Sequence, residues 1–223
     1  DIDLFKILPE KSYANMFFAI NLGEYYRFIK ALSKTNSGMS LDSYEKNAEA
    51  VLLSAPYEHS VSFMGGTAKA PKKIIEVLDN NLELFDVNLH YEPAKTIKTA
   101  QKEVTGISKL LPQKAARKIS AEYQKLYDAG KFIIMLGGEH TVSFGALEAI
   151  SKFENPKEVT ILQIDAHQDL RDDDSDYSNK KEKFAHSCVM RRIHELGFPI
   201  VQVGIRTYSK YEYEYWQKHW PAQ

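Results

Sequence analysis

The chain has 223 residues, of which 43% are hydrophobic and 26% charged, the composition of an ordinary globular protein. The formal net charge of −1 gives no electrostatic reason to expect nucleic acid or an anionic membrane as a partner. A single cysteine, Cys188, excludes an intrachain disulfide framework, and no apolar run near the start is long enough for a membrane span or signal core, so we expect a cytoplasmic protein.

Strand and helix patterns alternate along the chain after a poorly legible stretch over residues 1–50, which we treat as an N-terminal extension. "AVLLSAP" predicts a buried strand ended by Pro56, and the following segment predicts a helix with Pro71 in its first turn. The helix predicted over residues 114–130 places Gly130 where a helix commonly ends. "KFIIMLGG" (131–138) then predicts a strand.

The same alternation continues to the end of the chain. A helix is predicted over 141–153, a strand over 158–165, a helix over 187–197 and a strand over 199–206. The final helix opens with Ser209 and Glu212 at the spacing of a capping box. This order predicts one α/β domain built on a parallel sheet that is covered on both faces.

The stretch "DAHQD" directly follows the apolar strand "VTILQI". In extended backbone, residues two apart point to one side, so Asp165, His167 and Asp169 are expected to converge. Carboxylates with an imidazole suit divalent ions such as Mn²⁺. The alternative is an exposed acidic turn, but carboxylates crowded at a sheet edge repel one another unless a cation holds them. The following acidic residues, Asp172 to Asp174 and Asp176, are interpreted as a solvated loop.

Two further histidines have settings that suggest a role. His140 lies in "GGEHT", between a strand and a helix, and ligands gather outside the carboxyl ends of strands in open α/β sheets. His186 precedes a predicted helix about twenty residues after the acidic cluster, where a neutral histidine can transfer protons near pH 7. Structural or surface roles remain open for both.

These residues resemble the ureohydrolase family of arginases and agmatinases. The resemblance rests on five blocks that stand in the family order: "GTAKAPKKII" (66–75), "LGGEHT" (136–141), "DAHQDLRD" (165–172), "FAHSCVMRRI" (184–193) and "VQVGIRTYS" (201–209). The motifs are more similar to agmatinases than to arginases, because the loop after "DAHQD" lacks the arginase pattern. The resemblance implies a three-layer α/β sandwich with a mostly parallel central sheet.

The resemblance also implies a binuclear Mn²⁺ site. Asp165 would bridge both ions, His140 and Asp169 would bind one ion, and His167 would bind the other. A hydroxide bridging the metals would attack the guanidinium carbon of a small guanidino substrate, best represented by agmatine, to release urea and an amine. His186 would handle the proton that the leaving amine requires. Family members are commonly trimers or hexamers, so a homo-oligomer is expected.

One family block has no counterpart. The later metal-binding segment, which supplies two more carboxylates, does not occur before Gln223. We therefore expect the C-terminal part of the fold to be absent and this fragment alone to bind the second ion poorly. Three alternatives stay open: an arginase or guanidinobutyrase activity, a zinc deacetylase with one ion on a related α/β fold, and a metal-poor homologue without catalytic activity.

Overall fold

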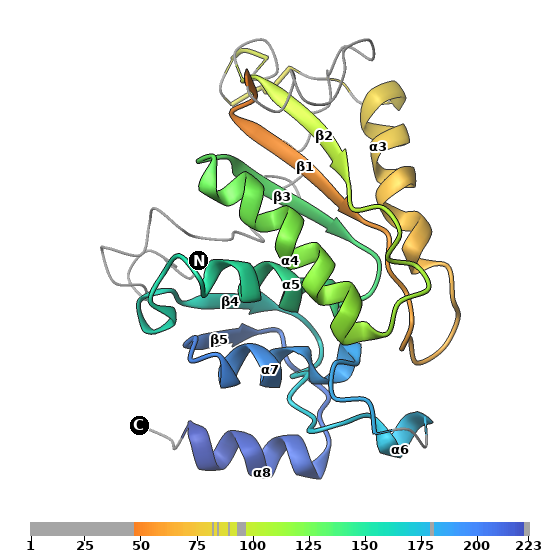
Figure 1. Ribbon diagram of the computed structural model, residues 1–223, viewed down its shortest axis with the longest axis vertical. Helices are drawn as coiled ribbons and strands as arrows, with labels where there is room; N and C mark the ends of the chain where they lie inside the picture. The colour runs from red at the N-terminus through yellow and green to blue at the C-terminus, as the bar shows by residue number, and fades with distance from the viewer. Residues whose placement is uncertain are drawn as a thin grey trace. The chain divides into compact units, whose positions relative to one another are not determined.

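The computed structural model describes residues 47–81, 83, 85–88, 90–92, 97–178 and 181–220 (Figure 1). These residues fall into two compact units, 47–149 and 150–220. Except for its last four residues, the N-terminal extension expected over residues 1–50 lies outside the described residues.

The unit of residues 47–149 is built on a parallel sheet of three strands in the order β2-β1-β3 (Figure 1). The central strand β1 (Ala50–Ala55) is buried along its whole length. It pairs with β2 (Thr99–Glu103) from Ala50↔Thr99 onward and with β3 (Phe132–Gly137) from Ala50↔Phe132 onward. The carboxyl ends of the three strands therefore meet at one edge of the sheet.

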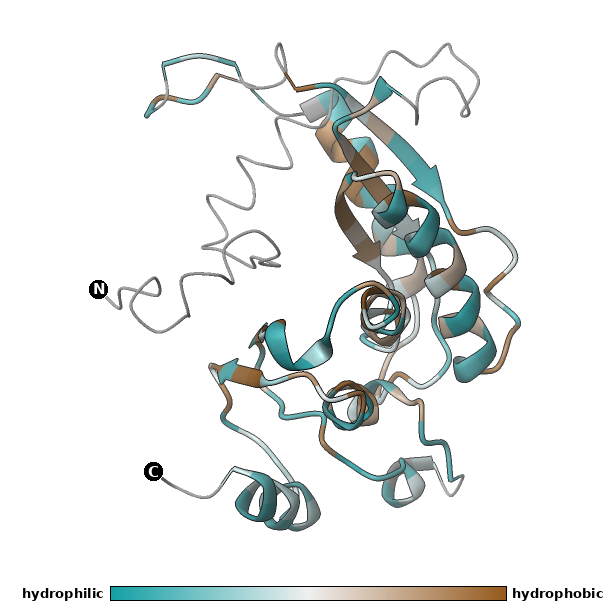
Figure 2. Ribbon diagram, turned by 60° about the vertical axis from the view of Figure 1, so that its left-hand side comes forward, coloured by the Kyte–Doolittle hydropathy of each residue, from teal (hydrophilic) through white to brown (hydrophobic). Residues whose placement is uncertain are grey.

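Strand β2 was not predicted from the sequence. Its sequence, "TAQKE", is polar for a strand, and its ribbon is largely hydrophilic (Figure 2). Because β2 is an edge strand of the sheet that the described residues form, its less buried residues are not required to be apolar. The strand is defined by its pairing with β1 rather than by its own pattern.

Helices cover both faces of this sheet. After a short 3-10 turn, η3 (Thr67–Lys69), helix α3 (Ala70–Asn81) packs Leu78 against Ala50, Leu52, Ile134 and Leu136 on one face. Val51 and Leu53 point to the opposite face and are also fully buried. Helices α4 (Pro112–Asp128) and α5 (Val142–Ile150) complete the unit, in which Gly145 of α5 packs closely on Ile119 of α4.

The end of α4 confirms the expected glycine stop. Gly130 has a positive φ of 68° and donates its N–H to the carbonyl of Tyr127, while Lys131 donates to the carbonyl of Leu126. This pair of bonds is the Schellman arrangement, which satisfies the last carbonyls of a helix.

The unit of residues 150–220 contains a second parallel pair, β4 (Ile161–Ile164) with β5 (Ile200–Val203), in register from Ile161↔Ile200. The short turn η5 (Pro156–Glu158) precedes β4. The described residues between β4 and β5 form α6 (Ser175–Ser178), η6 (His186–Cys188) and α7 (Val189–Glu195). Helix α8 (Lys210–His219) begins with the predicted capping box of Ser209 and Glu212.

Every strand pair among the described residues is parallel, and strands alternate with helices. The prediction of an α/β class with a parallel sheet is therefore confirmed. Within the described part of the chain, no helix has the length and apolar character that a membrane span requires.

Candidate metal site

The segment that carries Asp165 continues the pairing of β4 beyond the end of the strand. Asp165 donates its N–H to the carbonyl of Val203 over 3.0 Å, and the carbonyl of Ala166 accepts the N–H of Arg206 over 2.9 Å. Gly204 has a φ of 88°, and a Cβ at that position would lie 3.1 Å from the Asp165 carbonyl oxygen. The backbone before the candidate ligands is thus firmly held.

Asp169 has an unusual backbone conformation. Its φ is 53°, in the left-handed region that few residues other than glycine adopt, although aspartate tolerates it. Its carbonyl accepts the N–H groups of Met190 over 3.0 Å and Arg191 over 3.2 Å. Both donors belong to the first turn of α7, whose N–H groups have no partner within the helix. The helix therefore anchors the backbone of Asp169.

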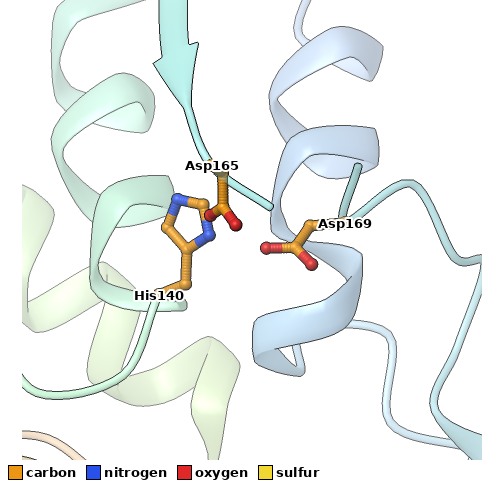
Figure 3. A group of neighbouring side chains, drawn as sticks. All are labelled: His140, Asp165 and Asp169. Atoms are coloured by element: carbon orange, nitrogen blue, oxygen red, sulfur yellow. The ribbon is translucent and has the colours of Figure 1, made fainter. Parts of the chain in front are cut away.

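The carboxylates of Asp165 and Asp169 are turned toward each other (Figure 3), and each offers an oxygen within 4.8 Å of the other. The side chain of Asp169 is buried and that of Asp165 is half-buried. Two carboxylates at this separation repel each other unless a cation or a proton lies between them. Oxygen donors of this kind are the ligands that hard divalent ions such as Mn²⁺ prefer, so the residues present fit such an ion.

His167 lies beside this pair rather than between its members. The side chain of His167 is exposed, and its ring Nδ1 lies 3.6 Å from Oδ1 of Asp165. The backbone N–H of His167 donates to the same oxygen over 2.9 Å. The expectation that Asp165, His167 and Asp169 converge by the alternation of an extended strand is wrong in its physical basis. The left-handed turn at Asp169, not alternation, brings the two carboxylates together.

His140 belongs to the unit of residues 47–149, where it lies between the end of β3 and the start of α5 (Figure 3). The glycines before it are required by packing. A Cβ on Gly138 would lie 2.0 Å from the carbonyl oxygen of Tyr57, a backbone atom that cannot easily move. The segment of His140 therefore passes directly against the segment that follows β1.

Glu139, for which the sequence predicted no role, holds these two segments together through hydrogen bonds. Its carboxylate is 4% exposed. One oxygen accepts the N–H groups of His59 and Ser60, both over 2.7 Å, and the other accepts the hydroxyls of Ser60 and Thr141, both over 2.8 Å. In "GGEHT", a charged residue stands between a buried strand and a candidate ligand. That position is the sequence signal that could have indicated a structural role for Glu139.

His186 opens η6 and is half-buried. The backbone carbonyl of Ser187, the next residue, accepts the backbone N–H of Arg171 over 3.2 Å. The turn that carries His186 is thus bonded to the segment just after Asp169, within the same unit. This places the predicted proton-transfer residue on a turn connected to the acidic pair.

The interpretation of residues 172–176 as a solvated acidic loop is wrong for Asp174, which is buried and whose Oδ1 accepts the N–H of Glu182. Asp172 is exposed, as expected, but it also binds the guanidinium groups of Arg191 over 3.3 Å and Arg192 over 3.2 Å. These partners lie eight or more residues away, so the local charge density did not reveal them.

In each unit the candidate ligands follow the carboxyl end of a parallel strand, His140 after β3 and Asp165 after β4, where α/β proteins bind their ligands. The model of the Arginase family matches residues 48–221. The chain therefore belongs to the arginase family.

Curated relatives and solved structures agree with this assignment. Agmatinase of Bacillus anthracis is 32% identical over 194 residues, which are 86% of this chain and 63% of that protein. N(1)-aminopropylagmatine ureohydrolase of Synechocystis sp. is 29% identical over 170 residues, 74% of this chain and 53% of that protein. The agmatine ureohydrolase structure of Thermoplasma volcanium aligns with a TM-score of 0.60 at 29% identity, over 77% of this chain and 54% of that one.

Arginase from Medicago truncatula shares the fold, with a TM-score of 0.65 at 22% identity over 88% of this chain and 62% of that one. The expected arginase fold is thereby confirmed. The chain spans about half to two thirds of the length of the proteins it matches.

Proposed function

We propose that this protein is a manganese-dependent amidinohydrolase that splits agmatine into putrescine and urea. The observation that carries the proposal is the pair of facing carboxylates, Asp165 and Asp169, at the end of β4 in a chain of the arginase family. The names of its relatives support the substrate class, because they act on agmatine or aminopropylagmatine.

We assign the metal ligands as follows. Asp165 would serve both ions, His140 and Asp169 would hold one of them, and His167 would hold the other. His140 follows β3 in the same way that Asp165 follows β4, at the carboxyl end of a parallel strand. The exposed position of His167 beside Asp165 leaves its ring accessible to an ion.

Bound Mn²⁺ would lower the pKa of water and so supply hydroxide near neutral pH. The chain's own residues then have two tasks. The carboxylates of Asp165 and Asp169 are held in place and carry negative charge, which also attracts a cationic guanidinium group. His186 donates a proton to the departing amine, because imidazole exchanges protons near neutral pH.

The direct test measures urea release by the Mn²⁺-loaded full-length protein from agmatine, N(1)-aminopropylagmatine, arginine and guanidinobutyrate. The expected result is the highest kcat/KM with agmatine, and absence of urea from all four would contradict the proposal. Asp165→Asn is expected to abolish activity and tight Mn²⁺ binding. Asp128→Asn, at the exposed end of α4, is the matched control and should change neither.

Metal analysis separates the remaining alternatives. In the intact protein we expect about two Mn²⁺ per subunit under the binuclear assignment. A count near one, with zinc preferred, would favour a deacetylase-like site instead. Calorimetric titration without tight Mn²⁺ binding would favour a homologue that lacks catalytic activity.

A further inference from the structure

The peptide group that joins Asp169 to Leu170 is held at both of its polar atoms. Its carbonyl, on Asp169, accepts two N–H groups from the first turn of α7. Its N–H, on Leu170, donates to Oε1 of Glu212 over 3.1 Å. A peptide bonded on both sides cannot rotate freely, so these contacts fix the backbone on the carboxyl side of Asp169.

Glu212 is more buried, and makes more hydrogen bonds, than its role as a helix cap requires. A capping-box glutamate only has to reach the N–H of the N-cap residue, and Oε2 of Glu212 does so by accepting from Ser209 over 2.7 Å. Yet the carboxylate is only 3% exposed, and its other oxygen is bonded outside the helix to Leu170. Arg171 Nε lies 3.7 Å from Oε2 and offsets part of the charge.

Burial of a carboxylate is costly unless its partners compensate for lost water. Capping alone would leave Glu212 free to remain at the surface, as Glu214 does on the same helix, where it pairs with Lys210 in solvent. The buried arrangement therefore serves the contact with the segment after Asp169. Asp169, which precedes that segment, has the left-handed φ of 53°, a conformation that aspartate tolerates but adopts less readily than glycine.

We propose that Glu212 is a positioning residue for the metal ligand Asp169. It acts through the Leu170 N–H to keep the Asp169 backbone in the conformation that turns its carboxylate toward Asp165. The role in metal binding rests on the function proposed above. The contact also couples α8, forty-two residues further along the chain, to the metal site.

The first experiment compares Mn²⁺ affinity by calorimetry in the wild-type protein, Glu212→Gln and Glu214→Gln. The amide side chain in Glu212→Gln has a single oxygen, so either the Leu170 or the Ser209 N–H loses its acceptor. We expect Mn²⁺ binding to weaken about 10–100-fold in Glu212→Gln, the range for residues that orient metal ligands. Glu214→Gln is the matched control on the exposed face and should bind as the wild type does.

Two further variants separate positioning from general stability. Ser209→Ala removes the side-chain cap of α8 but leaves the bond from Leu170 to Glu212, so Mn²⁺ affinity should stay within about twofold of wild type while thermal stability falls. In an Asp169→Asn background, Glu212→Gln should weaken Mn²⁺ binding no further, because its effect passes through Asp169. Equal losses in both backgrounds would overturn the proposal.

A measurement without metal completes the test. We expect amide hydrogen exchange at Leu170 to accelerate about tenfold or more in Glu212→Gln, as for loss of a hydrogen bond to a charged group. Unchanged exchange at Leu170 would overturn the proposal even if the wild type binds no Mn²⁺. Tight Mn²⁺ binding without urea release would refute the amidinohydrolase function and leave the role of Glu212 standing.

Discussion

The segments of His140 and Asp169 both follow a parallel strand, yet they are held in different ways. The His140 segment is fixed by close packing and by one buried carboxylate: Gly138 leaves no room for a Cβ against Tyr57, and Glu139 accepts hydrogen bonds from the segment of His59. The Asp169 segment is fixed by hydrogen bonds to its backbone, from the first turn of α7 and to Glu212 of α8. The His140 segment depends on excluded volume and on the buried carboxylate of Glu139, whereas the Asp169 segment depends on hydrogen bonds from its backbone to distant elements.

This difference predicts how each segment responds to substitution. A segment held by packing fails when atoms are added, since interiors are close-packed and backbone atoms cannot yield cheaply. A segment held by hydrogen bonds fails when a donor or acceptor is removed. The first kind of damage is expected to destabilise the fold, and the second to displace a ligand.

Gly138→Ala should have the largest effect on stability. Its Cβ would lie 2.0 Å from the Tyr57 carbonyl oxygen, so the free energy of unfolding should fall by about 3 kcal/mol or more. Urea denaturation followed by circular dichroism measures the change. Gly65→Ala is the control, because its Cβ would meet only the movable carboxylate of Glu58, and it should cost less than about 1 kcal/mol. Equal losses would show that packing does not hold this segment.

Glu139→Ala should be the next most damaging change. It leaves the N–H groups of His59 and Ser60 without their acceptor, at a cost of about 1–3 kcal/mol each. Glu139→Gln should cost less than half as much, because its oxygen can serve both N–H groups while its amide donates to the two hydroxyls. The same urea denaturation compares the variants, and a Gln variant as unstable as the Ala variant would contradict this account.

Asp169→Ala and Asp169→Asn both remove the charge and are expected to weaken Mn²⁺ binding alike. They differ in backbone preference, because asparagine tolerates the left-handed region and alanine does not. Without metal, the Ala variant should therefore unfold about 1 kcal/mol more easily than the Asn variant. If chelated samples of the two variants have equal urea midpoints, the left-handed turn stores no strain.

The smallest expected effect is the loss of stability of the protein as the pH falls. Burial, and then repulsion from His219, lower the pKa of His194 on α7 below its usual 6.5. The unfolded chain then binds the proton more readily, so the stability contribution is present above about pH 6.5 and is lost as pH falls through the lower folded value. His194→Gln should therefore lose less thermal stability than wild type between pH 7.5 and pH 5. Parallel losses in the two proteins would exclude this role.

Elements whose sequence signals lie within the element or directly beside it were predicted correctly. The apolar runs of β1 and β3, the glycine stop at Gly130 and the capping box at Ser209 all depend on residues close in sequence. Strand β2 was missed because its polar sequence becomes a strand only by pairing with β1. The burial of Asp174 was missed for a similar reason, since its partner Glu182 lies across a loop.

By itself, the sequence determined the kinds of candidate ligand and their places after successive strands, because strand periodicity and turn chemistry are local properties. It also identified the family, through motifs in a fixed order. Only the tertiary structure decided how the two aspartates meet. The turn at Asp169 has no signal in "DAHQD", because it is held by Met190, Arg191 and Glu212, twenty-one to forty-three residues away in the chain. Such contacts exist only once the helices that supply them have packed.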